Sequence, residues 1–312
     1  MSKNTDIEWC DSTINPSMGC EGCELWTKKT RICYAGVLHE TRHGTPGFAH
    51  TFENPEVFPD RMEQATSWKD LRGTERVGRK SSPDKPWLNA CPRTIFVGDM
   101  GDLFSVSIKD EYIKNVVKQA VGMPQHIWQF LTKRPTRMAN LFEKDKAMLP
   151  RNIWFMTSVT DNRSLVRVEW LKKTDAYCKG LSIEPLFEDI SFELEYHLPG
   201  IDWVVIGGAS GVGVPRTEPE WILKIIERCK KLNIPVFVKQ LGSGHFRGDP
   251  KGGNWLNWPR ELRVRQMPLQ KITPHADWQF HPTDFYAYKQ DLFDQSSPNV
   301  LKSGTSIPNR GA

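Results

Sequence analysis

The sequence predicts an α/β protein built as a complete or partial (β/α) barrel of the TIM type. Short apolar runs recur along the chain at a nearly constant interval, and amphipathic segments lie between several of them. Such runs are typical of strands buried on both faces of a parallel sheet, and the interval matches one strand-plus-helix unit. An open, doubly wound sheet is the alternative with the same alternation.

The expected strands end in polar or glycine residues. They are residues 94–97, 127–131, 153–156, 180–183, 203–206 and 235–238, and a further strand is expected before a cysteine-rich segment. In barrels and open sheets, reactive groups gather at the carboxyl ends of the strands. Each residue alone also fits a barrel salt bridge or a loop hydrogen bond. The candidate site residues at these ends are Asp99, Asp102, Lys133, Arg134, Ser158, Glu184, Gly207, Gly208 and Lys239.

Two of the intervening segments have clear helical patterns. Apolar residues recur at helical spacing between residues 108 and 120 and again between residues 221 and 229. Before the second stripe, Thr217 and Glu220 predict a capping box, with Pro219 in the first turn. A weaker stripe covers residues 165–171.

Composition sets the broad class of the protein. The chain has 312 residues and a net charge of +5, which is weak support for an anionic partner. We expect a barrel over residues 1–268 and an accessory extension over residues 269–312, the last part of it disordered. No run of 18 apolar residues and no signal-peptide pattern is present, so we expect a cytoplasmic protein without membrane contact.

Three of the seven cysteines lie close together near the N-terminus. Cys20, Cys23 and Cys33 have the spacing C-x2-C-x9-C. Thiolates are soft ligands that suit iron–sulfur clusters and zinc. Structural zinc sites and electron-transfer [4Fe–4S] clusters have four protein ligands, whereas three thiolates leave one iron open for a substrate or cosubstrate. The pattern favours a [4Fe–4S] cluster with an open iron.

Other interpretations of the cysteines remain open at this point. His39 or His43 would complete a structural zinc site, Cys10 would supply a fourth thiolate, or the cysteines have no metal role. The isolated residues Cys91, Cys178 and Cys229 are expected to be small buried hydrophobic side chains.

Several motifs in fixed order carry a family resemblance over residues 7–268. They are Ile7-Glu8-Trp9, Asn15-Pro16, Gly19-Cys20, Cys33-Tyr34-Ala35, the run from Phe96 to Phe104, Leu131-Thr132-Lys133-Arg134-Pro135, Ser182-Ile183-Glu184-Pro185, the run from Asp202 to Gly208, and Lys239-Gln240-Leu241-Gly242. The sequence resembles an uncharacterised phage-associated family with a three-cysteine motif. That family is related to radical S-adenosylmethionine enzymes and, distantly, to spore photoproduct lyase. The usual radical-enzyme signature is C-x3-C-x2-C with an aromatic residue before the last cysteine, whereas Tyr34 here follows it.

The resemblance implies cofactors and residue roles. A [4Fe–4S] cluster on Cys20, Cys23 and Cys33 would bind S-adenosylmethionine at its open iron, and an external electron donor would trigger formation of a 5′-deoxyadenosyl radical. The resemblance also implies two further sets of residues, one for S-adenosylmethionine and one for a carboxylate or phosphate. The first set is Asp99, Asp102, Ser158, Glu184, Gly207 and Gly208, and the second is Lys133, Arg134 and Lys239.

The function implied is hydrogen abstraction from a nucleotide or nucleic-acid base. One concrete version is isomerisation of a modified base in phage DNA, in which case the protein would act in the host cytoplasm. Two other classes compete with this function. One is a zinc-stabilised barrel that binds nucleic acid or a partner protein without catalysis. The other is a cluster protein that senses redox state or passes electrons.

Overall fold

The main element of the fold is a seven-stranded, wholly parallel sheet. The computed structural model describes residues 2–42, 44–78, 84–143, 149–211 and 213–272. The strand order is β1-β4-β5-β6-β7-β8-β9. The strands are β1 (Ser12–Ile14), β4 (Arg93–Val97), β5 (His126–Thr132), β6 (Ile153–Ser158), β7 (Cys178–Leu186), β8 (Trp203–Gly208) and β9 (Val236–Gln240).

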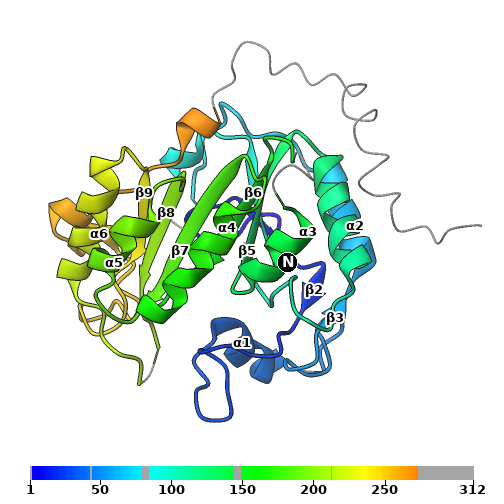
Figure 1. Ribbon diagram of the computed structural model, residues 1–312, viewed down its shortest axis with the longest axis horizontal. Helices are drawn as coiled ribbons and strands as arrows, with labels where there is room; N and C mark the ends of the chain where they lie inside the picture. Colours follow the sequence, from blue (N-terminus) through cyan, green and yellow to red (C-terminus); the bar gives the residue numbers. More distant parts are fainter. Residues whose placement is uncertain (1, 43, 79–83, 144–148, 212, 273–312) are drawn as a thin grey trace, which may run out of the picture. The chain divides into compact units, whose positions relative to one another are not determined.

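This strand order decides between the two predicted architectures. The order follows the chain without reversal, and right-handed crossovers then place every connecting helix on the same face of the sheet. A doubly wound sheet reverses its order and has helices on both faces. The curled sheet therefore forms a half-barrel, which confirms the predicted partial (β/α) barrel (Figure 1).

The helices occupy the expected places between the strands (Figure 1). They are α1 (Tyr34–Arg42), α2 (Asp110–Val121), α3 (Pro135–Leu141), α4 (Val166–Lys172), α5 (Ser191–His197) and α6 (Pro219–Lys231). A two-stranded antiparallel ribbon is formed by β2 (Ser17–Met18) and β3 (Glu56–Val57). The 3₁₀ turns are η1 (Pro59–Ser67), η2 (Pro86–Leu88), η3 (Asn162–Leu165), η4 (Trp255–Asn257), η5 (Arg260–Leu262) and η6 (Leu269–Lys271).

The predicted capping box at the start of α6 is wrong. The N-cap residue is Glu218, which makes no side-chain capping bond. The Thr217 hydroxyl instead donates to the Leu186 carbonyl at 2.8 Å and accepts from the Ala209 amide at 2.9 Å. Thr217 therefore connects the ends of β7 and β8, and this tertiary role outweighs the local capping preference.

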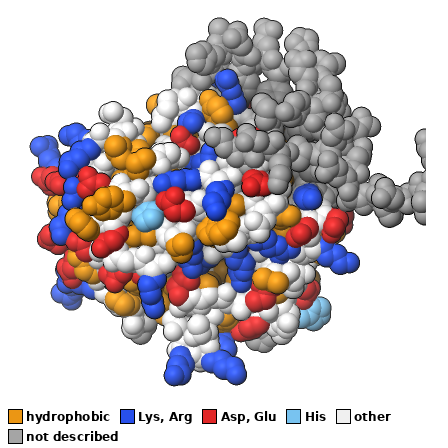
Figure 2. Space-filling view, viewed as in Figure 1, with side chains coloured by type: hydrophobic (Ala, Val, Ile, Leu, Met, Phe, Trp, Pro, Cys, Tyr) orange, Lys and Arg blue, Asp and Glu red, His pale blue; other side chains and the backbone are white. Residues whose placement is uncertain are grey.

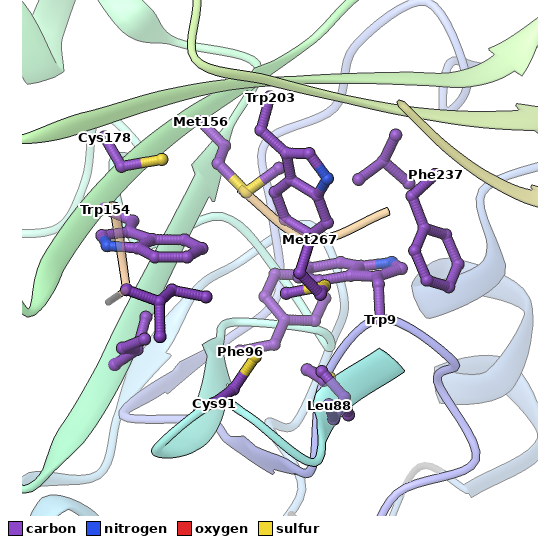
Figure 3. Close-up of a cluster of buried hydrophobic side chains, with 14 residues drawn as sticks. Trp9, Leu88, Cys91, Phe96, Trp154, Met156, Cys178, Trp203, Phe237 and Met267 are labelled. Carbon is purple, nitrogen blue, oxygen red and sulfur yellow. The ribbon is translucent and has the colours of Figure 1, made fainter. Parts of the chain in front are cut away.

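An aromatic cluster fills the face of the sheet opposite the helices. Trp9 lies beside Phe96 and Trp203, with ring centroids 4.9 and 5.9 Å apart, and Trp154 and Phe237 flank Trp203 (Figure 3). Buried aromatic side chains bring the largest apolar area per residue. This cluster supports the inner face of the half-barrel below the strand ends.

Both edges of the sheet are covered by irregular chain. At β9, the Val238 amide donates to the Val264 carbonyl at 2.8 Å, and the Gln266 amide donates to the Val236 carbonyl at 2.9 Å. At β1, Ser2 and Thr13 exchange two backbone hydrogen bonds. Covered edges do not pair with other chains. Of the predicted extension over residues 269–312, only residues 269–272 are among the described residues, and its disorder remains a prediction.

None of the helices in the described part of the chain is long and apolar enough to cross a membrane.

Candidate functional site

The three clustered cysteines lie on one loop that connects β2 to α1. Within this loop the Trp26 amide donates to the Cys23 carbonyl at 2.9 Å, and the amide of Cys33 donates to the Leu25 carbonyl at 3.1 Å. Cys33 directly precedes α1, whose Val37 amide donates to the Cys33 carbonyl. The predicted nine-residue excursion is therefore a compact, internally hydrogen-bonded loop.

Two glutamates anchor the cysteine loop to the carboxyl ends of the strands. Glu21 accepts from the Ser107 amide at 2.8 Å and the Ser107 hydroxyl at 2.6 Å. Glu24 accepts both terminal nitrogens of Arg167 at 2.8 and 2.9 Å and the Thr160 hydroxyl at 3.1 Å. Burial alone would raise the pKa of both carboxyls, but these donors lower each pKa to about 2.

Arg134 connects the cysteine loop to the end of β5. Its Nη1 lies 3.3 Å from the Cys20 Sγ and 3.2 Å from an Asp102 carboxylate oxygen. Its Nη2 donates to the Gly22 carbonyl at 3.0 Å and to Glu21 at 3.2 Å. Asp102 also accepts from the Thr132 hydroxyl at 2.7 Å, so this carboxylate fixes the guanidinium in place.

The sulfurs of Cys23 and Cys33 lie in a partly buried, electropositive setting. Burial raises the pKa of Cys23 to about 11 and also raises the pKa of Cys33, while backbone hydrogen bonds and the Lys133 ammonium oppose the rise. The charge of Cys20 contributes to the rise at both thiols, so the three sulfurs interact electrostatically. Burial lowers the pKa of Lys133, and Glu24, Cys23 and Cys33 counteract that fall.

The donor set fits a thiolate-ligated cluster in its chemistry. A cluster held by thiolates is anionic, and backbone amides, Arg134 and Lys133 face the sulfurs where they would compensate that charge. Within the described residues, no three His, Cys, Asp or Glu side chains are already arranged to hold a metal ion. Binding would therefore require the thiols to rotate about their side-chain bonds, which is within the ordinary rotamer range.

The alternative fourth ligands have other roles or positions. His39 is buried, and its Nε2 lies 2.7 Å from the Ala49 carbonyl oxygen. Cys10 is buried in the aromatic cluster of the inner face, whereas Cys20 belongs to a different buried cluster around Trp26. His43 lies outside the described residues. The expected burial of Cys91, Cys178 and Cys229 is confirmed.

A second polar group lies at the ends of β4, β7 and β9. The Lys239 Nζ is 2.5 Å from the Glu184 Oε1, and Asn15 Nδ2 donates to Asp99 Oδ1 at 2.6 Å. Burial raises the pKa of Asp99. Tyr34 is 63% exposed; burial of part of its side chain and the charge of Asp99 raise the pKa of its hydroxyl, while Lys239 opposes the rise. Tyr34 therefore brings the beginning of α1 close to this second group.

The remaining predicted residues have contacts within the fold. The carbonyl of buried Ser158 accepts from Arg167 at 3.1 Å. A Cβ at Gly208 would lie 2.0 Å from the Leu241 carbonyl oxygen, and one at Gly207 would lie 2.8 Å from the Glu184 carboxyl carbon. Close approach by the chain itself accounts for glycine at both positions. Their predicted role in binding S-adenosylmethionine remains a prediction.

The structure thus sorts the predicted site residues into two groups. Arg134 and Asp102 contact the cysteine loop directly, and Lys133 and Ser158 join it through Glu24 and Arg167. The second group contains Asp99, Glu184, Gly207 and Lys239, and Gly208 lies against the loop that follows β9. Sequence reasoning missed Glu21, Glu24, Arg167 and Asn15, although a carboxylate directly after each of two clustered cysteines is a signal that a cation lies nearby.

A half-barrel with a cysteine loop anchored on its strand ends defines the structural class of this protein. The chain belongs to a family described as "Protein of unknown function (DUF5131)", whose profile matches residues 4–299. No curated protein matches the sequence.

Solved structures of spore photoproduct lyase are similar to the chain at low identity. A cysteine-to-serine mutant of that enzyme is 15% identical with a TM-score of 0.41, over 70% of this chain and 61% of that one. A tyrosine-to-phenylalanine mutant is 13% identical with a TM-score of 0.43, over 71% and 74% of the two chains. The lyase complexed with dinucleoside spore photoproduct is 13% identical with a TM-score of 0.39, over 69% and 59%. The chain thus spans about three fifths of the first of these proteins.

Proposed function

We propose that this protein is a radical S-adenosylmethionine enzyme whose [4Fe–4S] cluster is held by Cys20, Cys23 and Cys33. The observation that carries the proposal is the contact between the Arg134 guanidinium and the Cys20 Sγ at 3.3 Å, on a loop that Glu21 and Glu24 anchor to the strand ends. A cation at a thiol favours the thiolate form, and thiolates are the ligands that iron–sulfur clusters require.

The bound cluster and S-adenosylmethionine would supply a 5′-deoxyadenosyl radical for hydrogen abstraction. The residues of the chain bind and orient the reacting groups. Arg134 and Lys133 balance the charge of the thiolates, and Asp102 holds Arg134 in position. The glutamates of the cysteine loop keep it closed over the strand ends. In this arrangement Lys133 and Arg134 act as positioning residues beside the sulfurs.

The second polar group is the proposed place for S-adenosylmethionine and the substrate. Asp99 and Glu184 offer carboxylate acceptors for amino or ribose groups, and Lys239 offers a cation for a carboxylate or phosphate. We propose a nucleotide or a DNA base as the substrate and isomerisation as the reaction. This part of the proposal follows from the sequence resemblance to a phage-associated family.

The experiment is anaerobic reconstitution with iron and sulfide, followed by metal analysis and visible and electron paramagnetic resonance spectroscopy. We expect about four iron and four sulfide per chain. Cys20→Ala, Cys23→Ala and Cys33→Ala should each abolish the cluster signal. Cys229→Ala is the matched control, because Cys229 is buried in α6 and should leave the iron content unchanged. A colourless protein that holds one zinc would overturn the proposal and favour a zinc-stabilised binding protein.

A further inference from the structure

A groove of about 470 Å³ lies between α3 and α4, beside the cysteine loop. Four cations contribute to its lining: Lys133, Arg134, Arg137 and Arg167. No carboxylate is among the lining residues, and the acidic partners of these cations, Glu21, Glu24, Asp102 and Asp110, all lie outside the lining. The surface that the groove presents to a partner is therefore basic.

The groove also exposes apolar side chains. Val106 is 76% exposed and Val166 is 59% exposed, and both line the groove together with half-buried Trp170. Viewed from the same side as Figure 1, basic and apolar side chains lie next to one another in the middle of this face (Figure 2). Exposed apolar residues surrounded by charges of one sign are typical of protein docking surfaces.

Arg134 connects this groove to the cysteine loop. It lines the groove, and its Nη1 lies 3.3 Å from the Cys20 Sγ. A protein seated in the groove would therefore be separated from the cysteine loop by the length of one side chain. Lys133 and Arg167 repeat this arrangement, since both line the groove and pair with Glu24, the neighbour of Cys23.

We propose that this groove is the docking surface for an acidic one-electron carrier protein that reduces the cluster. The inference rests on the proposed function. The reduced carrier would give one electron to the cluster and leave oxidised by one electron, with no atom transferred. Charge complementarity selects the carrier: a negative patch around its redox centre would meet the basic rim, and the apolar residues would supply contact area.

The same observations favour a protein over nucleic acid at this surface. Phosphate binding needs free N–H donors, and the arginines here are already occupied. Arg137 donates to the carbonyls of Ser105 and Ile108 and pairs with Asp110 at 2.5 Å. Arg167 is engaged with Glu24 through both terminal nitrogens. Fixed cations attract an acidic surface at long range without reorganising.

The test places negative charge in the groove without touching the cysteine loop. Thr136 and Asn140 are exposed lining residues on α3, and the variant is Thr136→Glu combined with Asn140→Glu. The matched control is Asn115→Glu, an exposed position on α2 outside the groove lining. The probe is a reduced flavodoxin, an acidic flavoprotein. Rates of cluster reduction are measured by stopped flow, and dithionite serves as a small reductant that needs no docking surface.

We expect flavodoxin to reduce the double variant at least about tenfold more slowly than the wild type at about 50 mM salt, with the difference shrinking at about 500 mM. Dithionite should reduce both proteins equally, and the control should match the wild type. Cluster-free protein provides a second measurement, because its flavodoxin affinity by calorimetry should fall in the same variant.

Equal flavodoxin rates and affinities for the variant and the wild type would overturn the docking proposal. So would a loss of salt-dependent DNA binding in the variant with unchanged flavodoxin reduction, which would assign the groove to nucleic acid. Failure of the proposed function has a different signature, since the wild type would then form no cluster that dithionite can reduce.

Discussion

Lys239 of β9 reaches across Gly207 of β8 to pair with Glu184 of β7 at 2.5 Å. A side chain at position 207 would collide with the glutamate, because a Cβ there would lie 2.8 Å from its carboxyl carbon. The intervening glycine thus allows an ion pair to form between strands that are not neighbours. Two charged groups of the second polar group are held together by this contact.

Gly207→Ala should destabilise the protein by about 1–3 kcal/mol, because the added methyl group displaces Glu184 from its ion pair. Urea unfolding measures the change in the free energy of unfolding. Gly253→Ala is the control, since nothing lies within 4 Å of a Cβ at that position. Equal unfolding midpoints for both variants would contradict the account of Gly207.

The Glu184–Lys239 pair should show coupling in a double-mutant cycle. Glu184→Gln and Lys239→Met each leave one charge without its partner, with side-chain exposures of only 21% and 19% in the wild type. We expect each single change to destabilise by about 1–3 kcal/mol and the double change to cost clearly less than their sum. Strict additivity of the two changes in unfolding free energy would show that the pair has no energetic role.

Glu24 should make stability depend on acid pH. Its pKa is about 2 in the folded protein and 4.5 without the fold, so its contribution is fully present above pH 4.5 and is lost as the pH falls towards 2. Between pH 7 and pH 3 the loss is roughly 2 kcal/mol. Urea unfolding at both pH values should show a drop that is smaller in Glu24→Gln by about this amount. An identical drop in both proteins would exclude the Arg167–Glu24 contact as its source.

Arg134→Gln should weaken cluster retention about 10–100-fold, because the guanidinium balances the charge at Cys20 and also holds the Gly22 carbonyl and Glu21. Iron release to a chelator measures the effect. Arg163→Gln is the control, since Arg163 is 90% exposed and pairs only with the nearby Asp161 among the partners described. Arg134→Lys should recover part of the loss, because an ammonium restores charge without the forked geometry. Unchanged iron release in Arg134→Gln would remove this role.

The strands were predictable from sequence because each is a short apolar run that the fold buries completely. The expected strand at 153–156 is observed as Ile153–Ser158, and the one at 203–206 as Trp203–Gly208. The strand order could not be read from these runs, since they look alike in a half-barrel and in a doubly wound sheet.

The anchoring of the cysteine loop was not predicted, because its partners lie far away in the sequence. Glu24 binds Arg167, 143 positions later, and Cys20 contacts Arg134, 114 positions later. Spacing identified the cysteines as a group, but it contains no information about which strand ends they contact. The failed capping box at Thr217 has the same cause, since a tertiary partner took the hydroxyl.

Cleavage of S-adenosylmethionine by the reconstituted protein is the most direct test of the proposed function. The protein is reduced with dithionite in the presence of S-adenosylmethionine, and 5′-deoxyadenosine is quantified by chromatography. The account predicts 5′-deoxyadenosine from the wild type and from Cys229→Ala, and none from Cys20→Ala, Cys23→Ala or Cys33→Ala. A wild-type protein that binds about four iron yet forms no 5′-deoxyadenosine, with candidate nucleotides and DNA present, would contradict the account.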